Sequence, residues 1–268
     1  MKKIDINLIL KLRKKTGSSL IECKKSLIKS NGNVEKALDY LRTTGICTAI
    51  RHSMNKSKIG KIFLYCDHIT SVLVQLNAET DFVIKNSLFS DLGNKIAQYA
   101  VKNKIFEIKE LRKIFNKKII FLINQTKENI VLNKIEHLQG QYISAYLHAG
   151  RIGVLLKWNA EFNVTNLELG KKIAMHIAAS NPLYLSQETI PKEILKKEYD
   201  IQMKLAKKTG KSSFVLEKIV QGRIKKFQNN YTLLEQNFIF DSNNTVKKFL
   251  YDKNFIIKKF IFFSLKDE

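Results

Sequence analysis

The sequence contains few cysteines and prolines: its 268 residues include three cysteines and two prolines. An odd number of cysteines without a C-x-x-C pair argues against a disulfide framework and against structural zinc. No apolar run approaches the ~18 residues that a membrane span needs. Residues 1–12 carry charges among their apolar positions and do not read as a signal peptide. We therefore expect a cytoplasmic protein without membrane association.

Arginine is also scarce, although the chain is strongly basic. Lysine and arginine number 47 against 24 acidic residues, a net charge of +23, and only six of the basic residues are arginines. Because arginine is favoured for bidentate phosphate and base recognition, this excess of lysine favours a solvated basic surface over a specific nucleic-acid site. A lysine-rich RNA-binding or ribosome-associated protein is the alternative, since lysines neutralise phosphate in non-specific binding. The 44% of hydrophobic residues predicts a folded chain.

The first 45 residues have the apolar spacing of a small three-helix domain. The predicted helices span residues 5–17, 19–32 and 33–45, the last ending at Thr44-Gly45. Ser19 and Glu22 have the spacing of a capping box at the start of the second helix. Leu20, Cys23 and Leu27 are predicted to lie on one face of that helix. The polar residues 46–59 are predicted to be a linker.

An internal repeat follows residue 60. Strand-like runs at 62–66 and 72–76 precede a helix that contains Leu92-Gly93. Two further runs at 142–147 and 152–157 precede a second helix that contains Leu169-Gly170. The repeat predicts an α+β fold whose core has two similar subdomains, each with a helix on one face of its strands.

The repeat also predicts the domain boundaries. The core subdomains are assigned to residues 60–140 and, in two pieces, to residues 141–182 and 228–268. Between these pieces, residues 183–227 are predicted to form an inserted coiled-coil hairpin. Its two amphipathic helices, 192–208 and 213–227, are joined by Thr209 to Ser212. A helix near 244–251 and a strand near 255–263 complete the prediction.

The sequence offers little enzyme chemistry. Gly210-Lys211-Ser212 lacks the first glycine of a phosphate-binding loop and follows a predicted helix rather than a strand. The five histidines show no metal-ligand spacing, and His176 is predicted to be a packed core residue. Glu79 and Asp81 could form the acid/base pair of a hydrolase, but carboxylates at this spacing are common on solvated turns. We predict that the protein is not an enzyme and needs no cofactor.

Two segments are similar to a known protein family. Residues 12–27 and residues 77–83, the latter reading Asn-Ala-Glu-Thr-Asp-Phe-Val, resemble the two signatures of bacterial elongation factor Ts. That family comprises the guanine-nucleotide exchange factors of elongation factor Tu. Residues 148–155, 173–180 and 221–227 resemble further family blocks in the same order, so the resemblance covers essentially the whole chain.

The resemblance implies a ubiquitin-associated-like N-terminal domain, the two-subdomain core and the hairpin, through which a homodimer could form. It also implies that the protein binds elongation factor Tu, both GDP-bound and nucleotide-free, and promotes exchange of GDP for GTP. Leu20 and Ile21 would pack on the partner's nucleotide domain, and His148 would lie at the same interface. The element that dislodges magnesium from the partner would be Thr80, Asp81, Phe82 and Val83.

Phe82 and Phe162 occupy corresponding places in the two repeats, but Thr80-Asp81 is inserted only before Phe82. Residues that are present in only one repeat are not needed for the shared fold, so they are the better candidates for a function. We therefore expect Phe82 to project from its turn and Phe162 to be buried in the core. Many family members carry a C-terminal module after the last core strand, and we expect no counterpart of it in this sequence.

Overall fold

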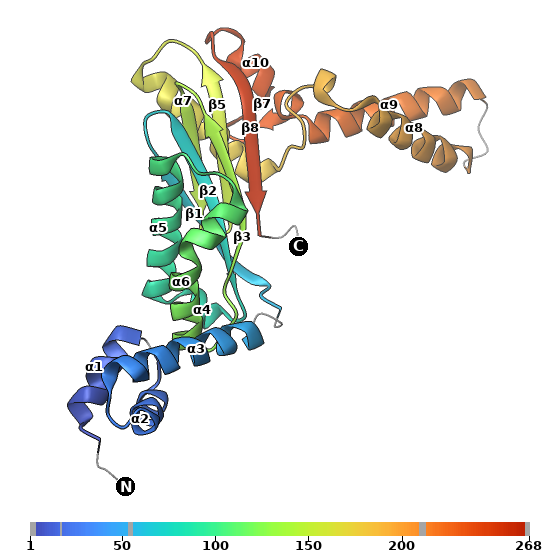
Figure 1. The fold of residues 1–268 in the computed structure, drawn as a ribbon. Helices are drawn as coiled ribbons and strands as arrows, with labels where there is room; N and C mark the ends of the chain where they lie inside the picture. Colours follow the sequence, from blue (N-terminus) through green and yellow to red (C-terminus); the bar gives the residue numbers. More distant parts are fainter. Residues whose placement is uncertain (1–3, 17, 53–55, 209–212, 266–268) are drawn as a thin grey trace. The chain divides into compact units, whose positions relative to one another are not determined.

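The computed structural model describes residues 4–16, 18–52, 56–208 and 213–265 (Figure 1). Helices and open sheets alternate along the chain, which confirms the α+β class. The chain divides into two compact units: one comprises residues 1–137, 149–152 and 264–268, and the other comprises residues 138–148 and 153–263. Within the described residues, each helix lacks the length or the apolar character needed to cross a bilayer. The predicted hairpin link Thr209 to Ser212 lies outside them.

Three helices make up the start of the first unit: α1 (Ile6–Thr16), α2 (Leu20–Lys29) and α3 (Val34–His52). The predicted capping box begins α2, because the Glu22 N–H donates to Ser19 Oγ at 3.2 Å and the Ser19 N–H donates to the Glu22 carboxylate at 3.0 Å. Apolar side chains from all three helices form one core: Ile9, Leu12, Cys23, Leu27, Ala37 and Leu41.

The third helix does not end at Thr44-Gly45, as predicted, but continues to His52 through the first part of the expected linker. Gly45 is buried, and a Cβ atom at this position would collide with the Asn124 side chain of α6 (Ile108–Thr126). The glycine therefore allows two helices to approach closely and does not terminate one.

The first sheet has the strand order β1-β2-β3. Strands β1 (Ile59–Cys66) and β2 (Thr70–Ala78) form an antiparallel hairpin, and β3 (Val131–Gln139) lies on the other side of β2. Each residue of the central strand β2 is buried. The short helix α4 (Asp81–Ile84) follows β2, and α5 (Ser87–Asn103) packs on both β1 and β2 and on α6. Neither α6 nor β3 was among the predicted elements.

The second sheet has the order β4-β5-β8, formed by β4 (Ile143–His148), β5 (Ile152–Asn159) and β8 (Ile256–Ser264). Helix α7 (Val164–Ser180) packs on β4. The predicted hairpin helices are confirmed: α8 (Lys192–Lys207) and α9 (Ser213–Tyr231) lie side by side in Figure 1 and contact each other. The remaining elements are η1 (Gln187–Thr189), η2 (Leu233–Glu235), β6 (Asn237–Phe238), β7 (Asp241–Thr245) and α10 (Val246–Tyr251).

The repeated Leu-Gly element has a physical reason in each sheet. A Cβ atom on Gly93 of α5 would collide with the ring of Phe63 in β1, and one on Gly170 of α7 would collide with Ser144 in β4. Each glycine thus lets the helix backbone lie directly on the side chains of a strand. In both sheets the hairpin is followed by this helix, and the third strand then pairs beside the second strand.

His176 is a packed core residue of the second unit, as predicted. Its side chain is buried, its Nδ1 accepts the Ile239 N–H at 3.3 Å, and its Nε2 lies 3.1 Å from Gln236 Oε1. Burial lowers the pKa of His176, and the Gln236 hydrogen bond offsets only part of this effect. The imidazole is therefore neutral in the folded protein at neutral pH.

Gly93→Ala should reduce the free energy of unfolding by about 1–3 kcal/mol, because a methyl group overpacks the contact between α5 and β1. Gly222→Ala is the matched control, since a Cβ atom at this position in α9 would meet nothing within 4 Å. Alanine is also the better helix former, so Gly222→Ala should stabilise the protein by about 0.5–1 kcal/mol. Denaturant unfolding measures both effects, and equal effects would contradict the packing role of Gly93.

The free energy of unfolding should fall as the pH falls below about 6.5, the ordinary pKa of histidine. Between that value and the lowered pKa of folded His176, the unfolded chain binds a proton that the folded protein excludes. Urea unfolding between pH 7.5 and pH 5.5 measures this slope. His176→Gln should flatten it, whereas His68→Gln, at an exposed position, should not. An unchanged slope in His176→Gln would assign the pH dependence to other groups.

Candidate functional site

The turn after β2 exposes an aromatic side chain. Phe82, the second residue of α4, is 80% exposed, which confirms that it projects from the turn. The adjacent Val83 is only 6% exposed and packs in the apolar core of the first sheet. A helix of four residues has little stability of its own, so burial of Val83 holds α4 in place. Val83 is therefore an anchor, and Phe82 is the accessible member of the predicted element.

Two carboxylates tie this turn to the connection between α6 and β3. Thr80 donates its N–H to Glu128 Oε2 at 2.9 Å and its hydroxyl to Glu128 Oε1 at 2.6 Å. In return, Glu79 Oε1 accepts the main-chain N–H of Asn129 at 2.6 Å. Hydrogen bonds to ionised carboxylates are the stronger kind. The sequence does not mark Glu128 as a partner of Thr80, because Glu128 lies 48 residues away and belongs to no motif.

Asp81 forms an ion pair with Lys85, the C-cap residue of α4. Its Oδ2 accepts a hydrogen bond from Lys85 Nζ at 2.6 Å, and this bond lowers the pKa of the Asp81 carboxyl. Both side chains are largely exposed, so the pair contributes little to stability. Glu79 is engaged with the main chain of Asn129 and Asp81 with Lys85, so each carboxylate has its own structural partner and the arrangement gives no support to a hydrolase.

The predicted apolar pair lies at the start of α2. Leu20 is 44% exposed and Ile21 is 66% exposed. The face that the spacing predicts for Leu20, Cys23 and Leu27 is buried only in part, because Cys23 and Leu27 are buried and Leu20 is not. Two adjacent exposed apolar side chains in the first turn offer a contact surface for a partner.

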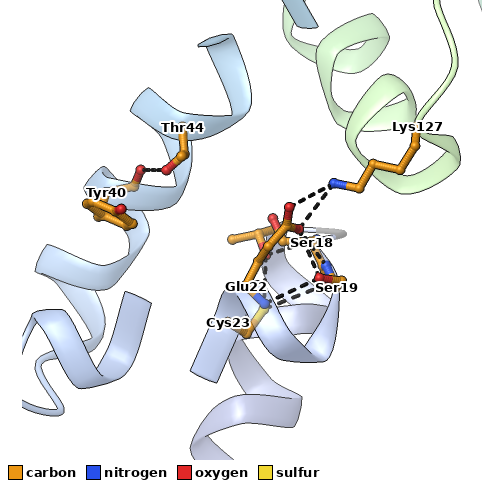
Figure 2. A network of polar contacts seen from close by, with 8 residues as sticks. Ser18, Ser19, Glu22, Cys23, Tyr40, Thr44 and Lys127 are labelled. Carbon is orange, nitrogen blue, oxygen red and sulfur yellow. Dashed lines mark hydrogen bonds and ion pairs between the residues drawn. The ribbon is translucent and has the colours of Figure 1, made fainter. Parts of the chain in front are cut away.

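Figure 2 shows the polar network beside this pair. Lys127 Nζ donates to both carboxylate oxygens of Glu22, at 3.0 and 3.2 Å. Partial burial raises the pKa of Glu22, but the hydrogen bonds from Lys127 and Ser19 outweigh this effect and lower the pKa overall. Because both side chains are about 40% exposed, the ion pair contributes at most about 1 kcal/mol. Lys127 is the C-cap residue of α6 and immediately precedes Glu128.

His148 lies at the end of β4 and belongs to the second compact unit. Its side chain is exposed, and its Nδ1 lies 3.1 Å from the hydroxyl of Tyr146. Residues two apart on a strand share a face, so Tyr146 orients the imidazole from the same side of the sheet.

Phe162 is not the buried core aromatic that the repeat predicted, because it is 62% exposed. It lies in the connection between β5 and α7, where its ring stacks on Tyr142 with centroids 5.5 Å apart. Trp158, which is 2% exposed, stacks on the same tyrosine at 4.9 Å from within β5. Trp158 of β5 therefore occupies the core, and Phe162 in the connecting segment stays exposed. Phe89 of α5, fully buried, is the suitable core control for Phe82.

The described residues contain no group of three or more histidine, cysteine, aspartate or glutamate side chains that could hold a metal ion. Cys23 and Cys66 are free thiols, buried and exposed respectively. Among the predicted site residues, Phe82 offers an exposed aromatic ring on an anchored turn, and Leu20 and Ile21 offer exposed apolar side chains on α2.

The sequence model of a family described as Elongation factor TS matches residues 79–267, a range that begins with the turn itself. The chain is 47% identical over 249 residues to elongation factor Ts of Buchnera aphidicola subsp. Cinara cedri (strain Cc), covering 91% of this chain and 90% of that protein. It is 42% identical over 248 residues to elongation factor Ts of Buchnera aphidicola subsp. Baizongia pistaciae (strain Bp), covering 92% of each. For elongation factor Ts of Haemophilus ducreyi (strain 35000HP / ATCC 700724) the identity is 37% over 246 residues, covering 92% of this chain and 85% of that protein.

These similarities extend over nearly the full length of both chains. The protein is therefore a translation elongation factor. It belongs to the elongation factor Ts family.

Phe82→Ala should leave the free energy of unfolding nearly unchanged, because the side chain already faces water. Phe89→Ala should reduce it by about 3–5 kcal/mol, because it removes a fully buried ring. Thermal and urea unfolding of the two variants measure this difference. A comparable loss in both would place Phe82 in the core and contradict its role as a projecting residue.

Proposed function

We propose that the protein binds elongation factor Tu carrying GDP, dislodges its magnesium ion and so promotes exchange of GDP for GTP, without catalysing a reaction of its own. The observation that carries this proposal is the exposure of Phe82 beside the ionised Asp81, on a turn anchored by Val83. Membership of the elongation factor Ts family supports the choice of partner.

The proposed mechanism follows from the coordination of magnesium. Magnesium requires nearly octahedral geometry and bridges the nucleotide phosphates, so a small displacement of its ligands loosens both the ion and the nucleotide. Burying Phe82 in a crevice of the partner would contribute about 1.5–3 kcal/mol to that displacement. The Asp81 carboxylate would bring a negative charge toward the site and perturb the surroundings of the ion. Because the turn is already anchored, little conformational entropy is lost on binding.

Two further regions would contribute affinity. Leu20 and Ile21 would pack on the partner's nucleotide domain, and His148 would contact the same protein from the second unit. Exchange then follows from linkage: a factor that binds the nucleotide-free partner more tightly than the GDP-bound partner must weaken GDP binding by the same ratio.

Release of fluorescent GDP from the cognate elongation factor Tu tests the proposal. The wild-type protein in substoichiometric amounts should accelerate release, and Phe82→Ala should slow the accelerated rate markedly at saturating concentration. Phe162→Ala is the matched control, because it removes an exposed phenylalanine from the corresponding place in the second repeat. It should leave the rate unchanged. Failure of the wild type to accelerate release would refute the proposal.

RNA binding measured on the same preparation distinguishes an exchange factor from the alternative, an RNA-binding protein. In that case RNA should bind tightly in a filter assay, with affinity falling steeply as salt rises, because lysines would release counterions from phosphate. An exchange factor should instead stimulate GDP release at moderate salt.

A further inference from the structure

We propose that Glu128 is the positioning residue of the turn, holding Thr80 so that Phe82 is presented to the partner in one orientation. This inference rests on the proposed exchange function. The side chain acts through Thr80: both of its carboxylate oxygens are engaged there, one with the main-chain N–H at 2.9 Å and one with the hydroxyl at 2.6 Å.

The first turn of α4 needs such an outside support. Thr80 is the N-cap residue of α4, yet its side chain makes no capping hydrogen bond to the helix. Its hydroxyl is instead donated to Glu128. A helix of four residues, all of them within one turn, has few hydrogen bonds of its own to define its direction. The direction of α4 therefore depends on the contact that fixes Thr80.

The connection that carries Glu128 is itself fixed on both sides. Lys127 ends α6 in the left-handed conformation, with φ of 60°, and its N–H donates to the Ile123 carbonyl at 2.8 Å. On the other side, Asn129 is only 4% exposed, and its main-chain N–H is held by Glu79 at 2.6 Å. The two segments are therefore joined by reciprocal contacts. The carboxylate of Glu79 holds Asn129, and the carboxylate of Glu128 holds Thr80.

Two different constraints then define the position of Phe82. Burial of Val83 sets how deeply α4 sits on the core, and the carboxylate of Glu128 sets the direction in which the helix begins. In the sequence, Phe82 lies between Thr80, which Glu128 holds, and the buried Val83. Removing the Glu128 contact leaves the depth unchanged but lets the phenylalanine sample other directions. The apolar pair on α2 is unaffected, so binding to the partner persists while the proportion of productive encounters falls.

The test measures GDP release from elongation factor Tu as a function of factor concentration. Glu128→Ala should reduce the maximal rate roughly tenfold, the effect of losing a hydrogen bond to a charged group. The half-saturating concentration should change by less than about twofold, because the other contacts persist. Glu128→Gln keeps the shape and one acceptor oxygen, so its rate should lie between those of the wild type and Glu128→Ala. Glu110→Ala, an exposed carboxylate in the first turn of the same α6, should match the wild type.

A double-mutant cycle and a partner-free measurement complete the design. The losses in Glu128→Ala and Thr80→Val should not add in the double variant, because Glu128→Ala already removes the hydroxyl contact that Thr80→Val removes. Hydrogen exchange at the Thr80 amide of the free protein should be faster in Glu128→Ala and in Glu128→Gln than in the wild type. The partner-free measurement does not depend on the exchange function.

The outcomes separate the two proposals. If the wild type accelerates GDP release and Glu128→Ala does so equally well, positioning by Glu128 is refuted while the exchange function stands. A loss of rate accompanied by an equal weakening of half-saturation would also refute it, because Glu128 would then contribute to binding. Should Glu128→Ala fail to fold, an unreduced maximal rate in both Glu128→Gln and Thr80→Val would overturn the inference.

Discussion

The direct contact between helix backbone and sheet at Gly93 and Gly170 is the constraint on which the core depends. At both positions a Cβ atom would collide with a side chain of the neighbouring strand, so the helix can approach as closely as it does only with glycine there. At Gly93 this contact brings α5 directly onto the β1–β2 hairpin, in which all of β2 is buried. The turn that follows β2 therefore begins at the end of a fully buried central strand.

In the proposed function, folding and recognition depend on adjacent side chains of the same short helix. Val83 contributes to stability by burying its side chain in the core, whereas Phe82 contributes nothing of this kind in the free protein. An apolar ring left in water retains its full transfer free energy for a later binding event. The same division occurs in α2, where Cys23 and Leu27 are buried while Ile21 faces outward.

Several features could be predicted because they depend on residues close in sequence. The Ser19 and Glu22 capping box joins residues three apart, and its expected geometry is present. The β1–β2 hairpin and the helices α5, α8 and α9 follow periodicities of a few residues, so the sequence predicts them with shifted ends, whereas it does not predict α6 and β3. The exposure of Phe82 is also as predicted, but the insertion is not its physical cause, because Phe162 is exposed without one.

Other features were decided only by tertiary contacts. The sequence pattern predicts a helix terminus at Gly45, but this residue is a point of close contact with Asn124, and nothing in the neighbouring sequence distinguishes the two roles. Phe162 was expected in the core, yet Trp158 occupies that place from the strand. The Glu128 contact with Thr80 spans 48 residues of sequence. By itself the sequence determined the local elements and the family, because caps, periodicities and signatures involve neighbouring residues. Only the tertiary structure decided which distant side chains meet, because that depends on how the elements pack in space.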